Sequence, residues 1–257
     1  MNLHFVVLLI LLSFVLTMFC FGQNSELMFP LYRSMAGDRE LPKPYGLGIT
    51  YHYQKQDYDL AKLMVSLPGI DIGQAADAVK VENNTTEVNL KFDLWLLPFL
   101  NIFAIIGHVE GETEVQVPLL MQTLEIDYDG LVYGAGVTLA AGYKDFFGLL
   151  TMLYTETDLD VSTSSVDAFI VSPRVGYKTG FGQIWIGAMY QHTEEKHEGT
   201  IILPQFGKIN FDVELEEKDP WNYLAGVKID IRKNLDLEIE GGIGERKQVT
   251  ASLTYRF

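Results

Sequence analysis

Charged side chains that could build a polar site follow one another at every second position near the end of the chain. This spacing places them on one face of β-strands, because successive side chains of a strand point to opposite sides. Neighbouring rows carry opposite net charge, so we expect ion pairs between them, since charges enclosed in a narrow interior must be paired. A path for cations along Asp236, Glu238 and Glu240 is the functional alternative. The predicted charge network consists of Lys228, Asp230, Arg232, Asp236, Glu238, Glu240 and Arg256.

A second group of polar residues falls on the same, inward face of three earlier strands. Its members are His52, Lys91, Asp93, His108 and Glu110. A histidine beside a carboxylate could do acid–base chemistry. No serine shows a defensible pairing with a histidine, however, and the chain has no Gly-x-Ser-x-Gly elbow. The sequence therefore favours a protein without enzymatic activity, and a hydrolase is the alternative.

Acidic residues gather in segments that precede or follow the apolar runs. Carboxylates at this density could hold divalent cations through oxygen ligands, or they could form a solvated surface. The weak candidates for cation ligands are Glu214, Glu216, Glu217 and Asp219. No segment matches a known calcium loop, so we predict no metal and no cofactor.

The composition narrows the classes of function. The chain has 257 residues and a formal net charge of −15. Nucleic acid is therefore excluded as a partner, because phosphate binding needs a basic surface. Cys20 is the single cysteine, which excludes disulfide frameworks and thiolate zinc sites.

The elements that must position these residues are strands with one apolar and one polar face. In the last strand, Val249, Ala251, Leu253, Tyr255 and Phe257 alternate with polar residues. A transmembrane β-barrel, with one lipid-facing and one wet side, has this pattern. We expect ten strands, although eight or twelve are possible. The expected strands are residues 45–58, 85–96, 101–115, 123–141, 146–159, 166–178, from 183, 209–232, 235–244 and 247–257. A soluble β-sandwich is the alternative fold.

Four short turns alternate with longer connections along the chain. The turns fall at residues 97–100, 142–145, 179–182 and 232–234, and long external loops are expected at about 59–84 and 192–219. Bacterial barrels show this asymmetry, with short periplasmic turns. Leu60, Leu63, Met64 and Leu67 lie at helical spacing, so residues 59–81 could form a lid or plug. The apolar residues stand at odd-numbered positions throughout Ile209 to Ile231, which predicts one long strand. This strand would begin in a hairpin that projects from the cell surface, with its turn at Pro204–Gly207.

The start of the chain predicts export. Phe5–Phe21 is an apolar run, and Cys20 and Gly22 are small residues at the −3 and −1 positions of a cut after Gly22. This arrangement resembles a secretory signal peptide. We therefore expect a signal peptide at 1–22, a periplasmic lead-in at 23–44 and the barrel at 45–257.

Together, the signal, the short turns, the long loops and the terminal Phe257 resemble bacterial outer-membrane β-barrel proteins in general, without indicating one family. The resemblance implies the outer membrane of a Gram-negative bacterium, with membrane lipid, lipopolysaccharide and the barrel assembly machinery as partners. Inward glycines and carboxylates favour a narrow passive channel or small-solute transporter with mild cation preference, passing small cationic solutes. A closed structural barrel whose acidic loops and projecting hairpin bind a partner or surface is the alternative. Barrel enzymes of this kind modify lipids or cleave proteins.

Overall fold

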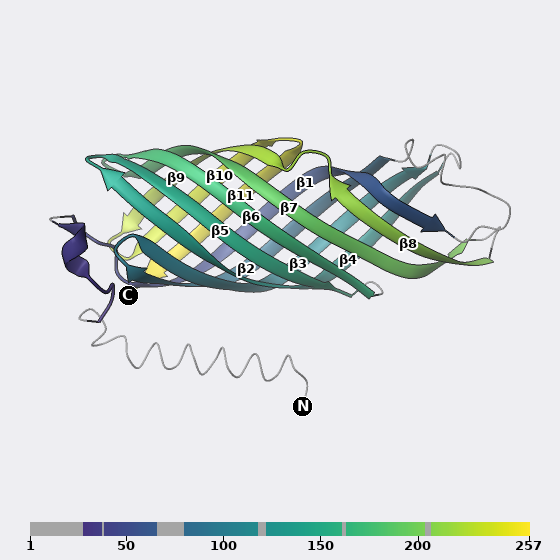
Figure 1. Ribbon diagram of the computed structural model, residues 1–257, viewed down its shortest axis with the longest axis horizontal. Coiled ribbons are helices and arrows are strands. Elements are labelled where there is room, and N and C mark those ends of the chain that lie inside the picture. Colours follow the sequence, from purple (N-terminus) through teal and green to yellow (C-terminus); the bar gives the residue numbers. More distant parts are fainter. Residues whose placement is uncertain (1–27, 38, 66–79, 118–121, 161–162, 204–206) are drawn as a thin grey trace, which may run out of the picture.

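The computed structural model describes residues 28–37, 39–65, 80–117, 122–160, 163–203 and 207–257. The described strands form one antiparallel sheet that closes on itself, because β11 pairs with both β10 and β1 (Figure 1). These strands are β1 (Tyr45–Val65), β2 (Lys80–Leu97), β3 (Leu100–Val117), β4 (Gln122–Tyr143), β5 (Phe146–Leu159), β6 (Thr163–Lys178), β7 (Gly182–Leu203), β8 (Gly207–Glu217), β9 (Trp221–Arg232), β10 (Leu235–Gly244) and β11 (Arg246–Arg256).

The main ring of the barrel contains ten of the described strands, namely β1 to β7, β9, β10 and β11. The closure between β11 and β1 runs from Gly46 opposite Arg256 to Gln56 opposite Arg246. A two-sheet sandwich has no such closure, so the predicted ten-stranded antiparallel barrel is confirmed.

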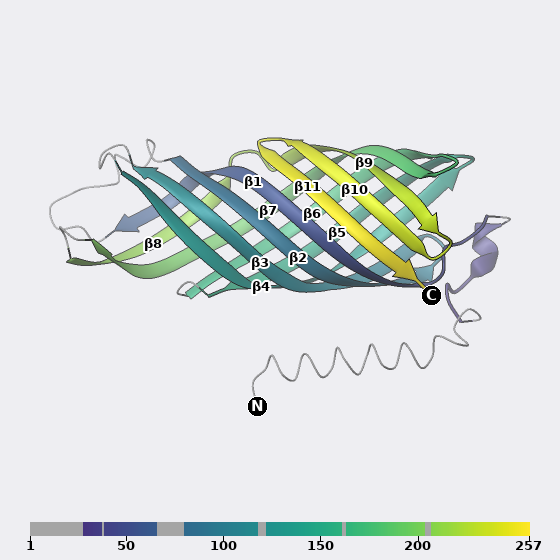
Figure 2. The same ribbon diagram turned by 180° about the vertical axis from the view of Figure 1, so that it is seen from behind.

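The strand β8 converts the far end of the barrel into a narrower ring. It pairs with β7 over Glu195–Leu203 on one edge and with β1 over Tyr58–Val65 on the other. Among the described strands, a ring of eight, β1 to β8, therefore closes beyond the end of the β10–β11 hairpin. Figure 2 shows this hairpin ending well before the far end of β1. We call the ten-strand ring the membrane section and the eight-strand ring the outer section.

The outer face of the ten-strand ring is apolar and ends in polar residues towards the outer section. On β4, for example, Leu131, Ala135 and Leu139 face outwards and are followed beyond Leu131 by the outward Asp129. Aromatic side chains border this band, with Phe146 against Tyr177 at 5.1 Å near the short turns and Tyr190 against Trp221 at 5.4 Å at the other edge. Within the described ranges, no helix is long and apolar enough to span a bilayer.

The short turns, the C-terminus and the described lead-in lie at one end of the barrel (Figure 1). Phe257 continues β11 through backbone hydrogen bonds with Tyr45, and the two rings stack with their centroids 5.8 Å apart. The lead-in carries a 3₁₀ helix, η2 (Arg33–Ala36), outside the barrel, and Leu31 N–H donates to the Leu96 carbonyl. The predicted signal segment lies outside the described residues.

The predicted external loops are mostly strand. β1 continues to Val65 and β2 begins at Lys80, so Leu60 to Met64 pair with β8 instead of forming a helical lid. Residues 66–79 of the proposed plug lie outside the described part of the chain. The predicted hairpin between β7 and β8 is present. Its end, where Gly207 to Asn210 pair with β7 alone, extends past the last pairing of β8 with β1, which is Val65 opposite Phe211, whereas Phe211 to Leu215 are paired on both edges. The expected long strand from Ile209 to Arg232 is interrupted at residues 218–220. Before them β8 pairs with β1, and after them β9 pairs with β10, so the β10–β11 hairpin enters the wall at this point.

Two β-bulges reverse the predicted direction of three candidate side chains. Trp95 pairs with Asn101 and Leu97 with Leu100, which leaves Leu96 as an extra residue. Because a one-residue slip moves a whole strand to its other face, His108 lies opposite the outward Val88 rather than Asn89. The inward placement predicted for His108 and Glu110 is therefore wrong.

The second bulge lies between β9 and β10. Leu235 pairs with Arg232 and Asp236 with Asp230, so Ile231 is the extra residue. Leu235 also pairs with the outward Tyr255, which places Arg232 on the outer face. The inward placement predicted for Arg232 is wrong for the same reason.

Candidate functional site

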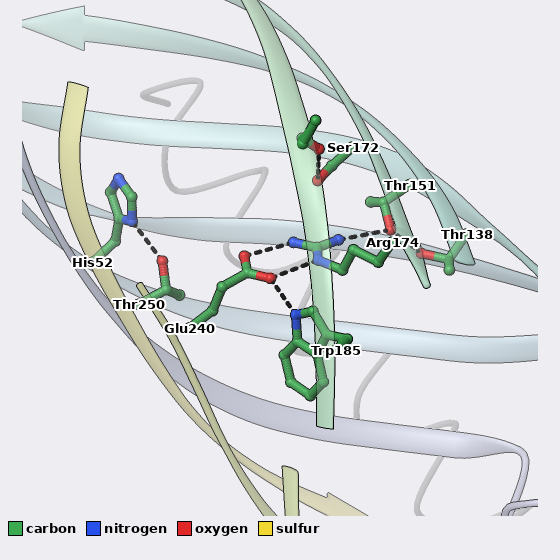
Figure 3. Close-up of polar contacts among 9 residues, drawn as sticks. His52, Thr138, Thr151, Ser172, Arg174, Trp185, Glu240 and Thr250 are labelled. Carbon is green, nitrogen blue, oxygen red and sulfur yellow. Dashed lines mark hydrogen bonds and ion pairs between the residues drawn. The ribbon is translucent and has the colours of Figure 1, made fainter. Parts of the chain in front are cut away.

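A charged pair crosses the lumen at the middle of the membrane section. Arg174 on β6 donates from Nε to Glu240 Oε2 at 2.6 Å and from Nη2 to Oε1 at 2.7 Å. Trp185 Nε1 on β7 donates to the same Oε2 at 2.6 Å. β6 and β10 are separated along the wall by β7 and β9, so these bonds span the interior (Figure 3). The side chains of Arg174 and Glu240 are only 15% and 6% exposed.

Glycine at position 226 makes room for this arrangement. A Cβ atom built at Gly226 would lie 2.3 Å from Cζ2 of the Trp185 ring. A side chain here would displace the indole that donates to Glu240. Sequence reasoning recognised the inward glycines but read them as open space in the lumen.

Hydroxyl groups surround the central pair. Arg174 Nη1 donates to Thr151 Oγ1 at 3.4 Å, and Thr151 lies 3.0 Å from Thr138 Oγ1. His52 faces Thr250, with Nδ1 2.8 Å from Oγ1 (Figure 3). The described hydrogen bonds of His52 are thus to Thr250 and Gln54, and they do not include a carboxylate. Neither Arg174 nor Trp185 was singled out from the sequence, because each has its strongest partner on a strand distant along the chain.

A second buried layer lies between the central pair and the outer section. Arg246 Nε donates to Gln56 Oε1 at 2.9 Å, and both side chains are almost completely buried. Arg246 Nη1 also lies 3.8 Å from Met189 Sδ. Within the described ranges, Arg246 Nη2 and the amide atoms of Asn222 and Gln248 have no hydrogen-bond partner. This layer is polar, buried and crossed by side chains from β1, β7, β9 and β11.

The third layer lies near the short turns and contains most of the predicted charge network. Asp93, 3% exposed, accepts hydrogen bonds from Asn101 Nδ2 at 2.8 Å and Arg256 Nη1 at 2.9 Å. Arg256 also lies 3.7 Å from Asp236, which lies 3.3 Å from Lys228. Lys228 lies in addition 3.5 Å from Asp230. The structure therefore joins four of the predicted residues, Lys228, Asp230, Asp236 and Arg256, and adds Asp93 from the second predicted group.

The other predicted site residues lie apart from this layer and from one another. Glu238 is exposed on the lumen side, whereas Glu240 belongs to the central pair. Lys91 lies over the Phe103 ring at 4.7 Å instead of beside Asp93. His108 and Glu110 form their own outward pair at 3.4 Å.

Of the candidate cation ligands near β8, two have other partners and two have side chains that the structure does not describe. Glu217 accepts hydrogen bonds from Thr193 N–H at 3.3 Å and lies 2.9 Å from His192 Nδ1. Asp219 accepts from Trp221 N–H at 2.9 Å. The side chains of Glu214 and Glu216 are outside the described part. No group of three or more His, Cys, Asp or Glu side chains in the described ranges could hold a metal ion.

The outer wall of β3 and β4 carries a ladder of facing carboxylates, which we call the acidic ladder. Its pairs are Glu110 opposite Asp129, Glu112 opposite Asp127 and Glu114 opposite Glu125. All six residues lie on the outer face beyond the apolar band. Apart from Glu110, none of them forms an ion pair with a described residue. By contrast, the neighbouring Glu82 on β2 is paired with Lys55.

The closed sheet and packed lumen define the class: an antiparallel β-barrel with a polar interior and an apolar outer band. No family model matches the sequence, and no curated protein matches it. The chain is similar to solved outer-membrane proteins. The transport unit of the autotransporter AIDA-I from Escherichia coli is 12% identical with a TM-score of 0.44, over 92% of this chain and 97% of that chain.

Two further solved structures have similar values. The outer membrane protein OprG from Pseudomonas aeruginosa is 14% identical with a TM-score of 0.45, over 86% of this chain and 100% of that chain. The outer membrane protease OmpT from Escherichia coli is 8% identical with a TM-score of 0.46, over 84% of this chain and 97% of that chain.

Proposed function

We propose that this protein is an outer-membrane β-barrel whose lumen is closed to solutes and whose outer section presents an acidic surface to a partner. The apolar outer runs, such as Val88–Leu96 and Phe169–Tyr177, match the roughly 9–11 residues that a tilted strand needs to cross the hydrocarbon core. The short turns and the C-terminus then lie on the periplasmic side, as is usual for bacterial barrels.

The cross-lumen pair of Arg174 and Glu240 is the observation that carries the closed state. Its two hydrogen bonds of 2.6 and 2.7 Å join strands that are separated along the wall by β7 and β9, and bidentate pairs of this kind are strong and geometrically specific. The Arg246 layer, towards the outer section, and the Asp93–Arg256 layer, towards the short turns, fill the lumen on either side of this pair. The packed lumen therefore favours the closed barrel over the narrow channel that the inward carboxylates predicted.

The acidic ladder supports a binding role for the outer section. Like charges directly opposite each other on a sheet are unfavourable, and the ladder places three such pairs on the outside of the barrel. A cationic partner would relieve this repulsion, as would divalent cations that bridge the carboxylates to the phosphate groups of lipopolysaccharide. Assembly into the membrane would proceed through the usual barrel machinery, with β11 and Phe257 closing the ring.

Planar-bilayer conductance of the refolded protein tests the proposal. We expect no stable conductance from the wild type and stable steps from the variant Arg174→Ala/Glu240→Ala, which removes the cross-lumen pair. The matched control is Lys55→Ala/Glu82→Ala, which removes an ion pair between the adjacent strands β1 and β2 on the outer face and should stay silent. Stable, cation-selective steps from the wild type would contradict the closed state.

The same experiment addresses a second candidate, a narrow channel. Buried amide atoms of Asn222 and Gln248 have no partner among the described residues, and unpaired polar atoms are compatible with a thread of water. Cation-selective conductance that falls in the variant Glu238→Gln would favour this candidate.

A further inference from the structure

The bulge between β9 and β10 moves a cation from the lumen to the outer face of the barrel. Asp230 faces the lumen, and strict alternation would turn Ile231 outwards and Arg232 inwards. Because Ile231 is an extra residue, Arg232 instead pairs with the outward Leu235. Bulges commonly re-aim a side chain in this way.

A cleft forms at this position on the periplasmic rim. It has a volume of about 540 Å³ and is lined by Arg232, Lys233, Asn234, Leu235 and Tyr255. Leu235 and Tyr255 are paired neighbours on the outer face of β10 and β11. The cleft therefore combines two cations and a phenol with the lower edge of the apolar band.

Among the described residues, the two cations of the cleft have no carboxylate partner. Neither Arg232 nor Lys233 forms an ion pair with any residue that the structure describes. The nearest acidic residues along the chain, Asp230 and Asp236, face the lumen and lie beside Lys228. In a chain with a net charge of −15, a cation on the outer face next to a second cation in the turn, neither with an ion pair among the described residues, marks a place for an external anion.

We infer that this cleft binds the phosphate headgroup of an anionic phospholipid in the inner leaflet of the membrane. Arginine suits phosphate because its planar group donates two parallel hydrogen bonds, and lysine adds a point charge. The acyl chains would lie along Ile231, Leu253 and Tyr255, which are 48%, 39% and 49% exposed. The inference rests on the proposed membrane orientation, which places the short turns at the inner leaflet.

Native mass spectrometry of the refolded protein in detergent micelles tests the cleft without requiring a bilayer. The probes are phosphatidylglycerol, phosphatidylcholine and inorganic phosphate. We expect the wild type to retain phosphatidylglycerol in preference to phosphatidylcholine. The variant Arg232→Gln/Lys233→Gln should bind phosphatidylglycerol at least about tenfold more weakly, since each charge-assisted hydrogen bond contributes on the order of a tenfold change.

The control variant Lys144→Gln/Lys178→Gln removes the same charge from two neighbouring short turns and should keep the preference. Equal retention of both lipids by the wild type, or equal loss in both variants, would overturn the inference. Displacement of the lipid by millimolar inorganic phosphate would also overturn it, because the cleft would then be a general anion site. Insertion of the same protein into vesicles is measured separately, so a failure to insert counts against the proposed function and not against the cleft.

Discussion

Carboxylates have opposite surroundings in the two sections of this barrel. In the membrane section, Glu240 lies inside the lumen and accepts hydrogen bonds from Arg174 and Trp185. In the outer section, Glu112 lies on the outside and faces Asp127 across the strand pair. The first carboxylate stabilises the fold through its partners, whereas the second is held by the strand register against an unfavourable neighbour.

The different surroundings of these carboxylates indicate which interactions stabilise each section. Side chains can just fill the interior of a barrel of about eight strands, and the ten-strand membrane section fills its wider interior with paired polar groups. The outer section is closed by backbone pairing of β8 with β7 and β1, so its outward charges are free to serve binding. Four predictions test this contrast, from the largest expected effect to the smallest.

The largest effect should follow from Glu240→Gln. The change leaves Arg174 buried without its counter-charge, and breaking one side of a buried ion pair costs about 3–5 kcal/mol. Urea unfolding of the protein in vesicles, followed by its heat-modified gel mobility, measures this loss. The control Glu238→Gln alters an exposed carboxylate on the same strand and should change stability by less than about 0.5 kcal/mol. Equal losses of stability in the two variants would show that the cross-lumen pair does not stabilise the barrel more than an exposed carboxylate does.

A smaller loss is expected from Gly226→Val. The new side chain would overlap the Trp185 ring, whose nearest atom lies 2.3 Å from an ideal Cβ, and overpacking costs about 1–3 kcal/mol. Near-ultraviolet circular dichroism of the indole should change together with the urea midpoint. The control Gly180→Ala adds a methyl group in a turn where nothing lies within 4 Å. An unchanged Trp185 signal in Gly226→Val would contradict the proposed packing.

The third prediction concerns the outer section alone. Glu217→Ala removes the acceptor for Thr193 N–H and the contact with His192, a loss of about 1–3 kcal/mol. We expect local opening of β8, seen as protease cleavage within Gly207–Glu217 on intact cells, while the membrane section keeps its unfolding midpoint. Wild-type β8 should resist cleavage from Phe211 to Leu215, where both of its edges are paired. Glu110→Ala, which changes an exposed carboxylate, serves as the control. Cleavage of the wild type and both variants at equal rates would contradict the stabilisation of β8 by Glu217.

The smallest effect, and one of opposite sign, should come from the acidic ladder. Glu112→Gln/Asp127→Asn removes a facing like-charge pair and should stabilise the outer section by about 0.2–1 kcal/mol. Hydrogen exchange of the β3 and β4 amides at low salt measures the change, which added salt should reduce. Glu82→Gln instead breaks the pair with Lys55 and should slightly destabilise the same region, because exposed ion pairs contribute little. A destabilising effect of the ladder variant would indicate that its carboxylates have favourable partners.

The sequence alone predicted most of the membrane section. The bounds of β5 (Phe146–Leu159) and β10 (Leu235–Gly244) agree with the predicted ones, as do the four short turns. Period-two alternation and turn residues are local signals, so no distant contact is needed to recognise them. Strand ends in the outer section were predicted less well, because there the outward residues are charged and the alternation of apolar residues disappears.

The sequence by itself determined the excess of carboxylates and the alternation of apolar and polar residues in most strands, from which ten strands were expected. Only the tertiary structure decided which side chains meet. The bulges at Leu96 and Ile231 shifted His108 and Arg232 to the outer face, and a single extra residue leaves no clear mark in composition. The pairing of Arg174 with Glu240, and of β8 with β1, joins residues far apart in the chain. Closure of the barrel brings such partners together, and the local sequence pattern contains no information about that distance.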